Sequence, residues 1–317
     1  MNEEGTVLVT GANGFVGRAL VEELANRRFQ KVVAAVRKRA GCFSEAVEEK
    51  VGLDIERDSG WSDALNGVSV VVHCAARVHV MTDPAKDPLG AFRRSNVEGT
   101  LRVARIAASK GVRRFVFLSS IKVNGESTEG RKPFTESDTP APEDFYGYSK
   151  LEAEEQLAAL CARESMELVI VRPPLVYGKG VGANFDALMR LSDTPWPLPF
   201  GCLNNRRSMV YLGNLVDGIG CLCTAPEAAG RTFLISDADD LSFSDLVREL
   251  RVLKGRSPRL LPVPAAFLEI MGKAVGKGDV IRRLTENLLV DSSSLKDTLG
   301  WHPPYSVREG LARTLAV

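Results

Sequence analysis

The sequence places a tyrosine four residues before a lysine, in the run Tyr146-Gly147-Tyr148-Ser149-Lys150. Residues four apart lie on the same face of a helix, so the phenol and the ammonium group are expected to be neighbours. A free phenol has a pKa of about 10, and a nearby ammonium lowers that pKa because it stabilises the phenolate. The pair could therefore exchange a proton with a substrate oxygen. A Tyr-x-x-x-Lys spacing also arises by chance on amphipathic helices.

A glycine-rich turn near the N-terminus is the second motif that could take part in chemistry. It reads Gly11-Ala12-Asn13-Gly14-Phe15-Val16-Gly17, after an apolar strand pattern and before a helical one. That context is typical of a dinucleotide site, in which the glycines permit a tight turn, close approach to the pyrophosphate and close packing, and the helix N-terminus attracts phosphate. The alternative is a tight turn without a ligand. The residues predicted to contact the cofactor here are Gly11, Asn13, Gly14, Phe15, Val16 and Gly17.

The end of the second apolar run bears on the choice of cofactor. An acidic residue for the ribose 2′-hydroxyl is expected about twenty residues after the glycines, but the chain reads Ala34-Ala35-Val36-Arg37-Lys38-Arg39. Because a guanidinium binds phosphate through two parallel hydrogen bonds, we predict that Arg37 selects NADP(H), with NAD(H) as the second option. A solvated basic turn is the alternative interpretation. Asp54 follows the next apolar run and could meet the adenine edge or cap a helix.

Short β-branched runs alternate with helical patterns over the first two-thirds of the chain, which predicts parallel strands joined by crossover helices. We therefore expect an α/β fold with a Rossmann-type doubly wound parallel sheet. The expected strands are 6–10, 31–36, 69–74, 114–119 and 168–171, and the clearest helices are 15–28, 96–110 and 148–163.

The sequence changes character after Val171. Prolines at 173, 174, 195, 197 and 199 predict a loop-rich cap without long regular elements. Helical patterns return at 214–224 and 244–253, and an apolar strand is expected at 232–235. We predict a dinucleotide-binding domain of residues 1–175, which residues 209–235 rejoin, and a smaller, mainly helical C-terminal lobe of residues 176–208 and 236–317.

Composition excludes several classes of protein. Hydrophobic residues make up 44% and charged residues 26% of the 317, with a formal charge of +1, so we expect a globular protein without a nucleic-acid partner. The acidic start Met1-Asn2-Glu3-Glu4 and the absence of a long apolar run predict a cytoplasmic protein that is not inserted in a membrane. Of the six cysteines only Cys221 and Cys223 are close in sequence, so we expect no metal site.

Together these motifs resemble the extended branch of the short-chain dehydrogenase/reductase superfamily, which acts largely on nucleotide sugars. The resemblance covers nearly the whole chain. It rests on the three glycines at 11, 14 and 17, His73-Cys74-Ala75-Ala76, Asn96-Val97-Glu98-Gly99-Thr100, Ser119-Ser120-Ile121-Lys122-Val123-Asn124-Gly125, the run from Tyr146 to Lys150, and Arg172-Pro173-Pro174-Leu175-Val176-Tyr177-Gly178.

The resemblance implies a role for each matching residue. Ser120 would hydrogen-bond the reacting C4 oxygen of the sugar, Tyr146 would give or take its proton, and Lys150 would bind the nicotinamide ribose and lower the tyrosine pKa. Asn96 would brace the backbone of the site and His73 to Ala76 would line the cofactor, with simple packing roles equally open. The further cofactor residues are Asp54, Ile55, Ala75, Ala76, Asn96, Tyr146, Lys150 and Pro173. The substrate residues are Ser120, Lys122, Asn184, Arg207 and Arg282, with Arg283 as an alternative to Arg282.

Departures from well-known relatives narrow the reaction. Ile121-Lys122 follows Ser120 where nucleotide-sugar 4,6-dehydratases carry Asp-Glu, and Val123-Asn124-Gly125 replaces the Val-Tyr-Gly of UDP-galactose 4-epimerases. The runs around Arg77, Ser120 and Arg207 look like those of bacterial UDP-2-acetamido-2,6-dideoxy-hexos-4-ulose 4-reductases, which make UDP-N-acetylquinovosamine or UDP-N-acetylfucosamine for lipopolysaccharide O-antigen. We expect that NAD(P)H-dependent reduction. The alternatives are a UDP-hexose 4-epimerase and, more remotely, a non-catalytic NADP sensor.

The resemblance also implies an oligomer. Family members commonly form homodimers through the two helices that we expect at 96–110 and 148–163. The alternating charge of the second helix is equally consistent with a solvent-exposed face.

Overall fold

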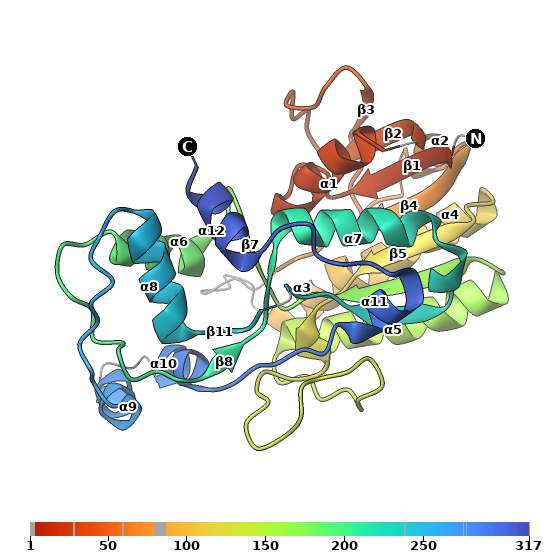
Figure 1. Cartoon of the computed structure of the whole chain (residues 1–317). Coiled ribbons are helices and arrows are strands. Elements are labelled where there is room, and N and C mark those ends of the chain that lie inside the picture. The colour runs from red at the N-terminus through yellow and green to blue at the C-terminus, as the bar shows by residue number, and fades with distance from the viewer. Residues whose placement is uncertain are drawn as a thin grey trace.

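The computed structural model describes residues 4–27, 29–58, 60–78, 87–237, 239–274, 276 and 278–316, with the side chains of 183, 184, 272, 279–281 and 283 outside this description. Its centre is a seven-stranded parallel sheet in the order β10-β6-β5-β4-β1-β2-β3 (Figure 1). The strands are β1 (Glu4–Thr10), β2 (Phe29–Val36), β3 (Val47–Val51), β4 (Val68–His73), β5 (Arg114–Leu118), β6 (Glu167–Arg172) and β10 (Arg231–Leu234). The strand order reverses between β1 and β4, where α/β sheets bind ligands at the carboxyl ends.

Helices cover both faces of this sheet (Figure 1). On one face lie α1 (Phe15–Ala25) and α7 (Leu212–Thr224), and on the other α2 (Trp61–Ala64), α4 (Thr100–Ser109) and α5 (Phe145–Arg163). Successive strand side chains point to opposite faces, so Val7 and Val9 join the core under α1 while Leu8 joins the core under α4. Burial on both faces explains why the central strands are almost uninterrupted apolar runs.

A smaller lobe lies beside the carboxyl ends of the strands (Figure 1). It contains α6 (Ala183–Ser192), α8 (Phe243–Leu253), α9 (Ala265–Ala274), α10 (Gly278–Thr285) and α12 (Val307–Leu315). Two small sheets, β7 (Leu175–Tyr177) with β9 (Met209–Tyr211) and β8 (Arg206–Arg207) with β11 (Leu241–Ser242), connect it to the main sheet. The chain then returns through α11 (Ser293–Leu299), which packs near β10.

Short helical elements prepare the site. They are α3 (Pro88–Phe92), the π-helix η1 (Arg93–Gly99), and the 3₁₀ turns η2 (Ile121–Val123) and η3 (Pro226–Ala228). Asn96 therefore lies in a π-helix that precedes α4, and not in the single helix expected over 96–110. π-Helical turns are uncommon and often occur at functional sites.

The sequence pattern located the central strands but missed three features of the fold. β3 was not expected because its sequence Val-Glu-Glu-Lys-Val is charged, as befits a strand at the edge of a sheet. The cap after Val171 was expected to lack long elements, yet α6 is a ten-residue helix, because the prolines flank it without interrupting it. Finally, α5 begins at Phe145, three residues earlier than expected, because Asp144 caps it by accepting the Gly147 N–H at 2.7 Å.

Candidate active site

A cavity of about 370 Å³ opens at the carboxyl ends of the strands around the point where the strand order reverses. Eight of the residues predicted to bind a cofactor line it: Gly11, Asn13, Gly14, Arg37, Asp54, Ile55, Ala75 and Ala76. Phe15, Val16 and Gly17 stand in the first turn of α1 and are not among the lining residues. These eight residues are therefore brought together around one cavity, while Asn96, Tyr146, Lys150 and Pro173 of the predicted set are not among its lining residues.

The glycine turn has the geometry that a bound pyrophosphate needs. Gly11 has a φ of +63°, and a Cβ there would lie 2.8 Å from the backbone nitrogen of Ala75. A Cβ on Gly17 would overlap the carbonyl oxygen of Gly11, so this glycine allows the helix to pack on the turn. No side chain caps the N-terminus of α1 at Gly14, which leaves its positive dipole end available to an anion. These residues fit a dinucleotide.

The far end of the cavity holds an exposed cation. Arg37 follows β2, lines the cavity, and makes no ion pair or hydrogen bond with any residue in the described part of the chain. Asp54 lies opposite, where its carboxylate accepts the Glu56 N–H at 3.0 Å and its carbonyl accepts the Trp61 indole N–H at 2.9 Å. Asp54 forms a turn and does not cap α2, whose N-cap is Gly60, so the helix-cap alternative was wrong.

Four polar or aromatic residues in this wall were missed by sequence reasoning: Glu56, Trp61, Arg77 and Ser95. The Ser95 hydroxyl donates to the Glu56 carboxylate, across 39 positions of sequence. Glu56 stands two residues after Asp54, which is a signal that could have been used. Nothing local in the sequence marks Ser95, because its partner comes from another element.

A buried, uncharged hydrogen-bond chain lies beneath the cavity. Thr10 and His73 face each other at the ends of β1 and β4. The Thr10 hydroxyl accepts the Ala75 N–H at 3.2 Å and lies 3.0 Å from His73 Nδ1, while the Thr100 hydroxyl lies 3.0 Å from His73 Nε2 and donates to the Asn96 carbonyl at 2.7 Å. The network therefore assigns the proton to Nε2 and leaves Nδ1 as an acceptor. Burial lowers the pKa of His73 to about 3, with a contribution from Lys150, so the imidazole is neutral.

Asn96 extends this chain to the helix that carries the tyrosine and the lysine. Its amide accepts the Arg77 N–H at 2.7 Å and donates to the Arg77 carbonyl at 3.0 Å and to the Ser149 hydroxyl at 2.9 Å. Ser149 in turn donates to the Tyr146 carbonyl at 2.8 Å. Asn96 thus joins the loop after β4 to the first turns of α5, in agreement with the bracing role that the resemblance implied.

Tyr146 and Lys150 lie on one face of α5, as their spacing predicted. The ammonium group of Lys150 is 5.9 Å from the centre of the Tyr146 ring and 4.4 Å from that of Phe117, and it donates to the Leu118 carbonyl at 2.7 Å. Burial lowers the pKa of Lys150 to about 8. The Lys150 ammonium group therefore lies at the end of β5, on the carbonyl of the residue that precedes Ser119.

The expected lowering of the tyrosine pKa was wrong for the protein without ligands. Burial, together with the Asp144 carboxylate, raises the pKa of Tyr146 above its ordinary value. Loss of hydration disfavours the charged phenolate, and the Asp144 carboxylate repels it. Tyr146 is therefore a protonated donor at neutral pH.

Residues 119–123, which we call the serine turn, follow β5 and lie against the start of α5. Ser120 begins η2, and its hydroxyl accepts the Lys122 N–H at 3.2 Å. The hydroxyl of neighbouring Ser119 is buried and has no hydrogen-bond partner among the residues described. A Cβ on Gly147 would lie 2.8 Å from the Lys122 carbonyl, so the glycine lets α5 approach this turn closely.

Lys122 was expected to bind substrate, and this role stays a prediction. In the structure its ammonium group pairs with the Asp144 carboxylate and with Glu126 at 2.8 Å. The position of Lys122 next to Ser120 in the sequence gave no indication of these two partners.

A second ion pair joins the same two elements deeper in the protein. Arg172, at the end of β6, donates to Glu154 of α5 through Nε at 3.0 Å and through a second nitrogen, and to the Asn124 amide oxygen at 3.0 Å. The Arg172 and Glu154 side chains are only 7% and 5% exposed. This pair ties α5 to β6 and to the residue that follows η2.

The remaining predicted residues fall into separate places. Pro173 is buried, and its carbonyl accepts the Ile121 N–H at 3.0 Å. Arg207 in β8 donates to the Glu286 carbonyl at 3.2 Å, and Arg282 in α10 lies 3.9 Å from the Glu143 carboxylate. The side chain of Asn184, and that of Arg283, lie outside the described residues. Arg207 and Arg282 are not among the residues that line the cavity described above. Arg282 lies beside Glu143, two residues before α5.

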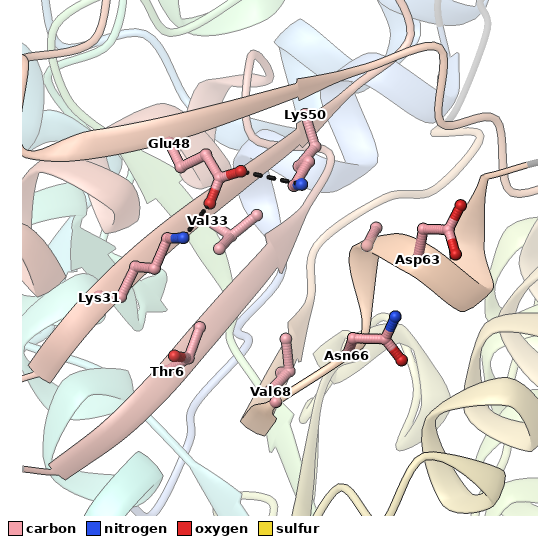
Figure 2. A pocket seen from close by; sticks show the side chains of 10 residues that line it. Thr6, Lys31, Val33, Glu48, Lys50, Asp63, Asn66 and Val68 are labelled. Carbon is pink, nitrogen blue, oxygen red and sulfur yellow. Dashed lines mark ion pairs between the residues drawn. The ribbon is translucent and has the colours of Figure 1, made fainter.

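A second cavity, of about 130 Å³, occurs at the amino-terminal ends of the strands (Figure 2). Its two lysines, Lys31 and Lys50, both point to Glu48 and pair with it. Hydrogen bonds from both lysines lower the pKa of Glu48. Both cations are therefore paired with a carboxylate of the same cavity, and the cavity lies at the end of the sheet opposite to the one where α/β proteins bind ligands.

Within the described parts of the chain, no cluster of three or more His, Cys, Asp or Glu side chains could hold a metal ion, and no helix is long and apolar enough to cross a membrane.

A doubly wound sheet with a glycine turn and a cavity where its strand order reverses defines the class of Rossmann-type dinucleotide-binding proteins. Residues 7–236 match the NAD dependent epimerase/dehydratase family, and the chain belongs to that family.

Similar proteins act on nucleotide-linked and lipid-linked sugars. The chain is 46% identical over 315 residues to a UDP-glucose 4-epimerase of Vibrio cholerae, with 98% of this chain and 94% of the relative covered. It is 28% identical over 323 residues to an N-acetyl-α-D-glucosaminyl-diphospho-ditrans,octacis-undecaprenol 4-epimerase of Escherichia coli O157:H7, with the same two shares covered.

Solved structures support the fold. MoeE5 in complex with UDP-glucose and NAD matches with a TM-score of 0.74 and 27% identity over 98% of this chain and 97% of that chain. The UDP-glucose 4-epimerase of Thermotoga maritima matches with a TM-score of 0.77 and 21% identity over the same shares. The second likeness concerns the fold alone.

Proposed function

We propose that this protein uses NADP(H), or NAD(H), to transfer hydride at C4 of a UDP-hexose, and that it reduces the 4-keto group of a UDP-4-keto-6-deoxy-N-acetylhexosamine. The product would be UDP-N-acetylquinovosamine or UDP-N-acetylfucosamine, for lipopolysaccharide O-antigen. The observation that carries the reaction type is the Tyr146–Lys150 pair of α5, which lies beside the serine turn at the end of β5.

The cofactor, when bound, supplies the hydride. In this proposal the turn from Gly11 to Gly14 holds its pyrophosphate, Arg37 holds a 2′-phosphate, and Asp54 with Ile55 meets the adenine. Lys150 binds the nicotinamide ribose while remaining bonded to Leu118. These roles use the uncapped N-terminus of α1 and a guanidinium without a partner among the described residues.

The protein then supplies a proton to the sugar oxygen. Ser120 hydrogen-bonds that oxygen and Tyr146 donates to it. Tyr146 is protonated at neutral pH, as a donor to a ketone oxygen must be. We assign the diphosphate of the substrate to the smaller lobe, with Asn184, Arg207 and Arg282 as its candidates.

The second candidate is a UDP-hexose 4-epimerase, which the 46% identical relative from Vibrio cholerae favours. The same three side chains would hold the C4 oxygen and move its proton, while an oxidised nicotinamide cofactor, when bound, would supply the hydride acceptor that takes hydride from C4 and returns it to the other face. In that case Tyr146 would have to act first as a base, and a bound oxidised cofactor with its positive charge would have to lower the phenol pKa.

One assay separates the two. Purified protein is mixed with NADPH or NADH and the UDP-4-keto-6-deoxy-N-acetylhexosamine, absorbance of the reduced nicotinamide is followed, and the product is analysed by NMR. Loss of absorbance supports the reductase. No loss with either cofactor, together with interconversion of UDP-glucose with UDP-galactose or of UDP-GlcNAc with UDP-GalNAc, would establish the epimerase. If neither reaction took place, the proposal would be contradicted.

Two variants test the assigned residues. Tyr146→Phe should lower turnover by about 10²-fold or more, since it removes the proton donor, and full turnover would contradict its assignment. Arg37→Ala should lower the preference for NADPH over NADH, because only NADPH carries the 2′-phosphate. An unchanged preference ratio would remove Arg37 from the cofactor site. Light scattering on the purified protein would test the proposed homodimer through α4 and α5.

A further inference from the structure

We propose that Lys122 is a positioning residue that fixes the Ser120 hydroxyl relative to Tyr146 by joining the serine turn to the cap of α5. The inference rests on the proposed function for its kinetic test, since it concerns the two side chains that would meet the sugar oxygen. Lys122 itself would touch neither sugar nor cofactor.

A chain of contacts through the Asp144 carboxylate connects Ser120 to the first turn of α5. The Lys122 N–H donates to the Ser120 hydroxyl at 3.2 Å, and the Lys122 ammonium pairs with Asp144. The other oxygen of Asp144 accepts the Gly147 N–H at 2.7 Å and so caps the helix turn that carries Tyr146. The Ser120 hydroxyl is thus held by Lys122 itself, and Tyr146 is one residue away from the N–H that Asp144 holds.

Close packing makes the connection stiff. The first turn of α5 lies so near η2 that a Cβ on Gly147 would be 2.8 Å from the Lys122 carbonyl and 3.0 Å from Pro142. The Ile121 N–H is fixed to the Pro173 carbonyl at 3.0 Å from the other side. The two elements that the Lys122–Asp144 pair joins are therefore in direct contact, so a small shift of either one changes the separation of Ser120 and Tyr146.

Charge explains why a cation is needed at this position. Glu126 also pairs with Lys122, at 2.8 Å, so two carboxylates converge on one ammonium group. The side chains of Lys122, Glu126 and Asp144 are 25%, 11% and 23% exposed, so the three charges meet at a partly buried position. Without the ammonium, the two carboxylates would repel each other across the gap between the serine turn and α5. The Asp144 charge is also felt at the phenol, because it contributes to the raised pKa of Tyr146.

The kinetic test compares three variants. Lys122→Met should lower kcat by about 10- to 100-fold, since small displacements of reacting groups cost that much, while KM for the cofactor and the nucleotide sugar stays within about twofold. Lys122→Arg should retain most of kcat because it keeps the cation. Asp144→Asn should reproduce the loss in kcat, because asparagine still caps the helix but does not attract the lysine.

A double-variant cycle makes the test independent of folding defects in one variant. If the pair acts as a unit, Lys122→Met combined with Asp144→Asn should lose no more kcat than either change alone. Additive losses would contradict the proposal. Arg93→Met is the matched control, because it breaks the Arg93–Glu152 pair of 2.6 Å on the same helix but outside the serine turn, and it should leave kcat unchanged.

Two other outcomes would overturn the inference. A rise in KM for the nucleotide sugar with unchanged kcat in Lys122→Met would mean that the lysine binds substrate, as the sequence first suggested. Unchanged kcat and KM would mean that it does neither.

A structural measurement separates failure of this inference from failure of the proposed function. If the wild-type protein neither reduces nor epimerises the sugars tested, crystal structures of wild type and Lys122→Met still report the distance between the Ser120 and Tyr146 hydroxyl oxygens. We expect it to change by about 1 Å, the scale of displacement that matters for catalysis. An unchanged distance would contradict the positioning role whatever the reaction is.

Discussion

Two ion pairs join α5 to the elements around the serine turn, and they differ in almost every physical respect. Arg172 and Glu154 form a buried fork in which both guanidinium and carboxylate use two contacts, with side chains 7% and 5% exposed. Lys122 and Asp144 form a single contact between side chains that are 25% and 23% exposed. One pair lies after the Lys150 turn of the helix and the other at its start.

The difference teaches which pair holds the fold and which holds the site. A buried charge that loses its partner is strongly destabilising, because nothing else compensates the lost hydration. A partly exposed lysine pair contributes little to stability, because water and salt replace much of it. We therefore expect the Arg172 pair to contribute strongly to the free energy of unfolding. We expect the Lys122 pair to contribute little to it and to act mainly on the relative positions of Ser120 and Tyr146.

The largest expected effect comes from breaking the buried pair. Arg172→Met should lower the free energy of unfolding by about 3–5 kcal/mol, because it leaves the Glu154 carboxylate buried and uncompensated. Urea unfolding followed by circular dichroism measures this. Adding Glu154→Leu should restore most of the loss, since the pair is then replaced by apolar groups. A loss below about 1 kcal/mol in the single variant would place Arg172 with the exposed pairs.

The uncharged hydrogen-bond chain through His73 should respond to acid. The folded-state pKa of His73 is lowered to about 3 from an ordinary value of 6.5, so below pH 6.5 the unfolded chain binds a proton that the folded one does not. Stability from this group is complete above pH 6.5 and should fall by about 1.4 kcal/mol per pH unit as the pH drops toward 3.

Comparing wild type with His73→Gln isolates that contribution. Urea unfolding at about pH 7 and pH 5 should show that acidification costs the wild type about 2 kcal/mol more than the variant, which has no imidazole to protonate. Equal losses in both proteins would mean that His73 titrates normally in the folded state.

The smallest expected effect on stability belongs to the exposed pair. Lys122→Met should change the free energy of unfolding by less than about 1 kcal/mol, and the difference from wild type should shrink further in about 1 M salt. The same comparison for Arg172→Met should be insensitive to salt. If Lys122→Met instead destabilises the protein as much as Arg172→Met, the division between fold and site that the two pairs suggest is wrong.

The sequence predicted the central strands and eight of the residues that line the larger cavity, because the signals for them are local. A run such as Val7-Leu8-Val9 followed by glycines identifies a buried strand and its turn without knowledge of any other segment. Ala75 and Ala76 were located by motif, and they line the same cavity as Gly11 because neighbouring parallel strands end at one edge.

What the sequence missed depends on partners that are distant in the chain. The direction of the Lys122 side chain is set by Asp144, 22 residues away, and the Ser95 hydroxyl finds Glu56 across 39 residues. The tyrosine pKa failed for a related reason. Spacing predicts which cation is near Tyr146, but the burial that raises the tyrosine pKa comes from the whole fold.

The hydrogen-bond chain through His73 also constrains how protons can travel. It starts at the Ala75 N–H and ends at the Asn96 carbonyl, two backbone groups that neither release nor accept a proton. Every donor between them points the same way, so the chain has one arrangement and cannot be reversed by passing protons along it. This hydrogen-bond chain therefore cannot serve as a proton relay beneath the site, and it holds the imidazole in one tautomer and one orientation.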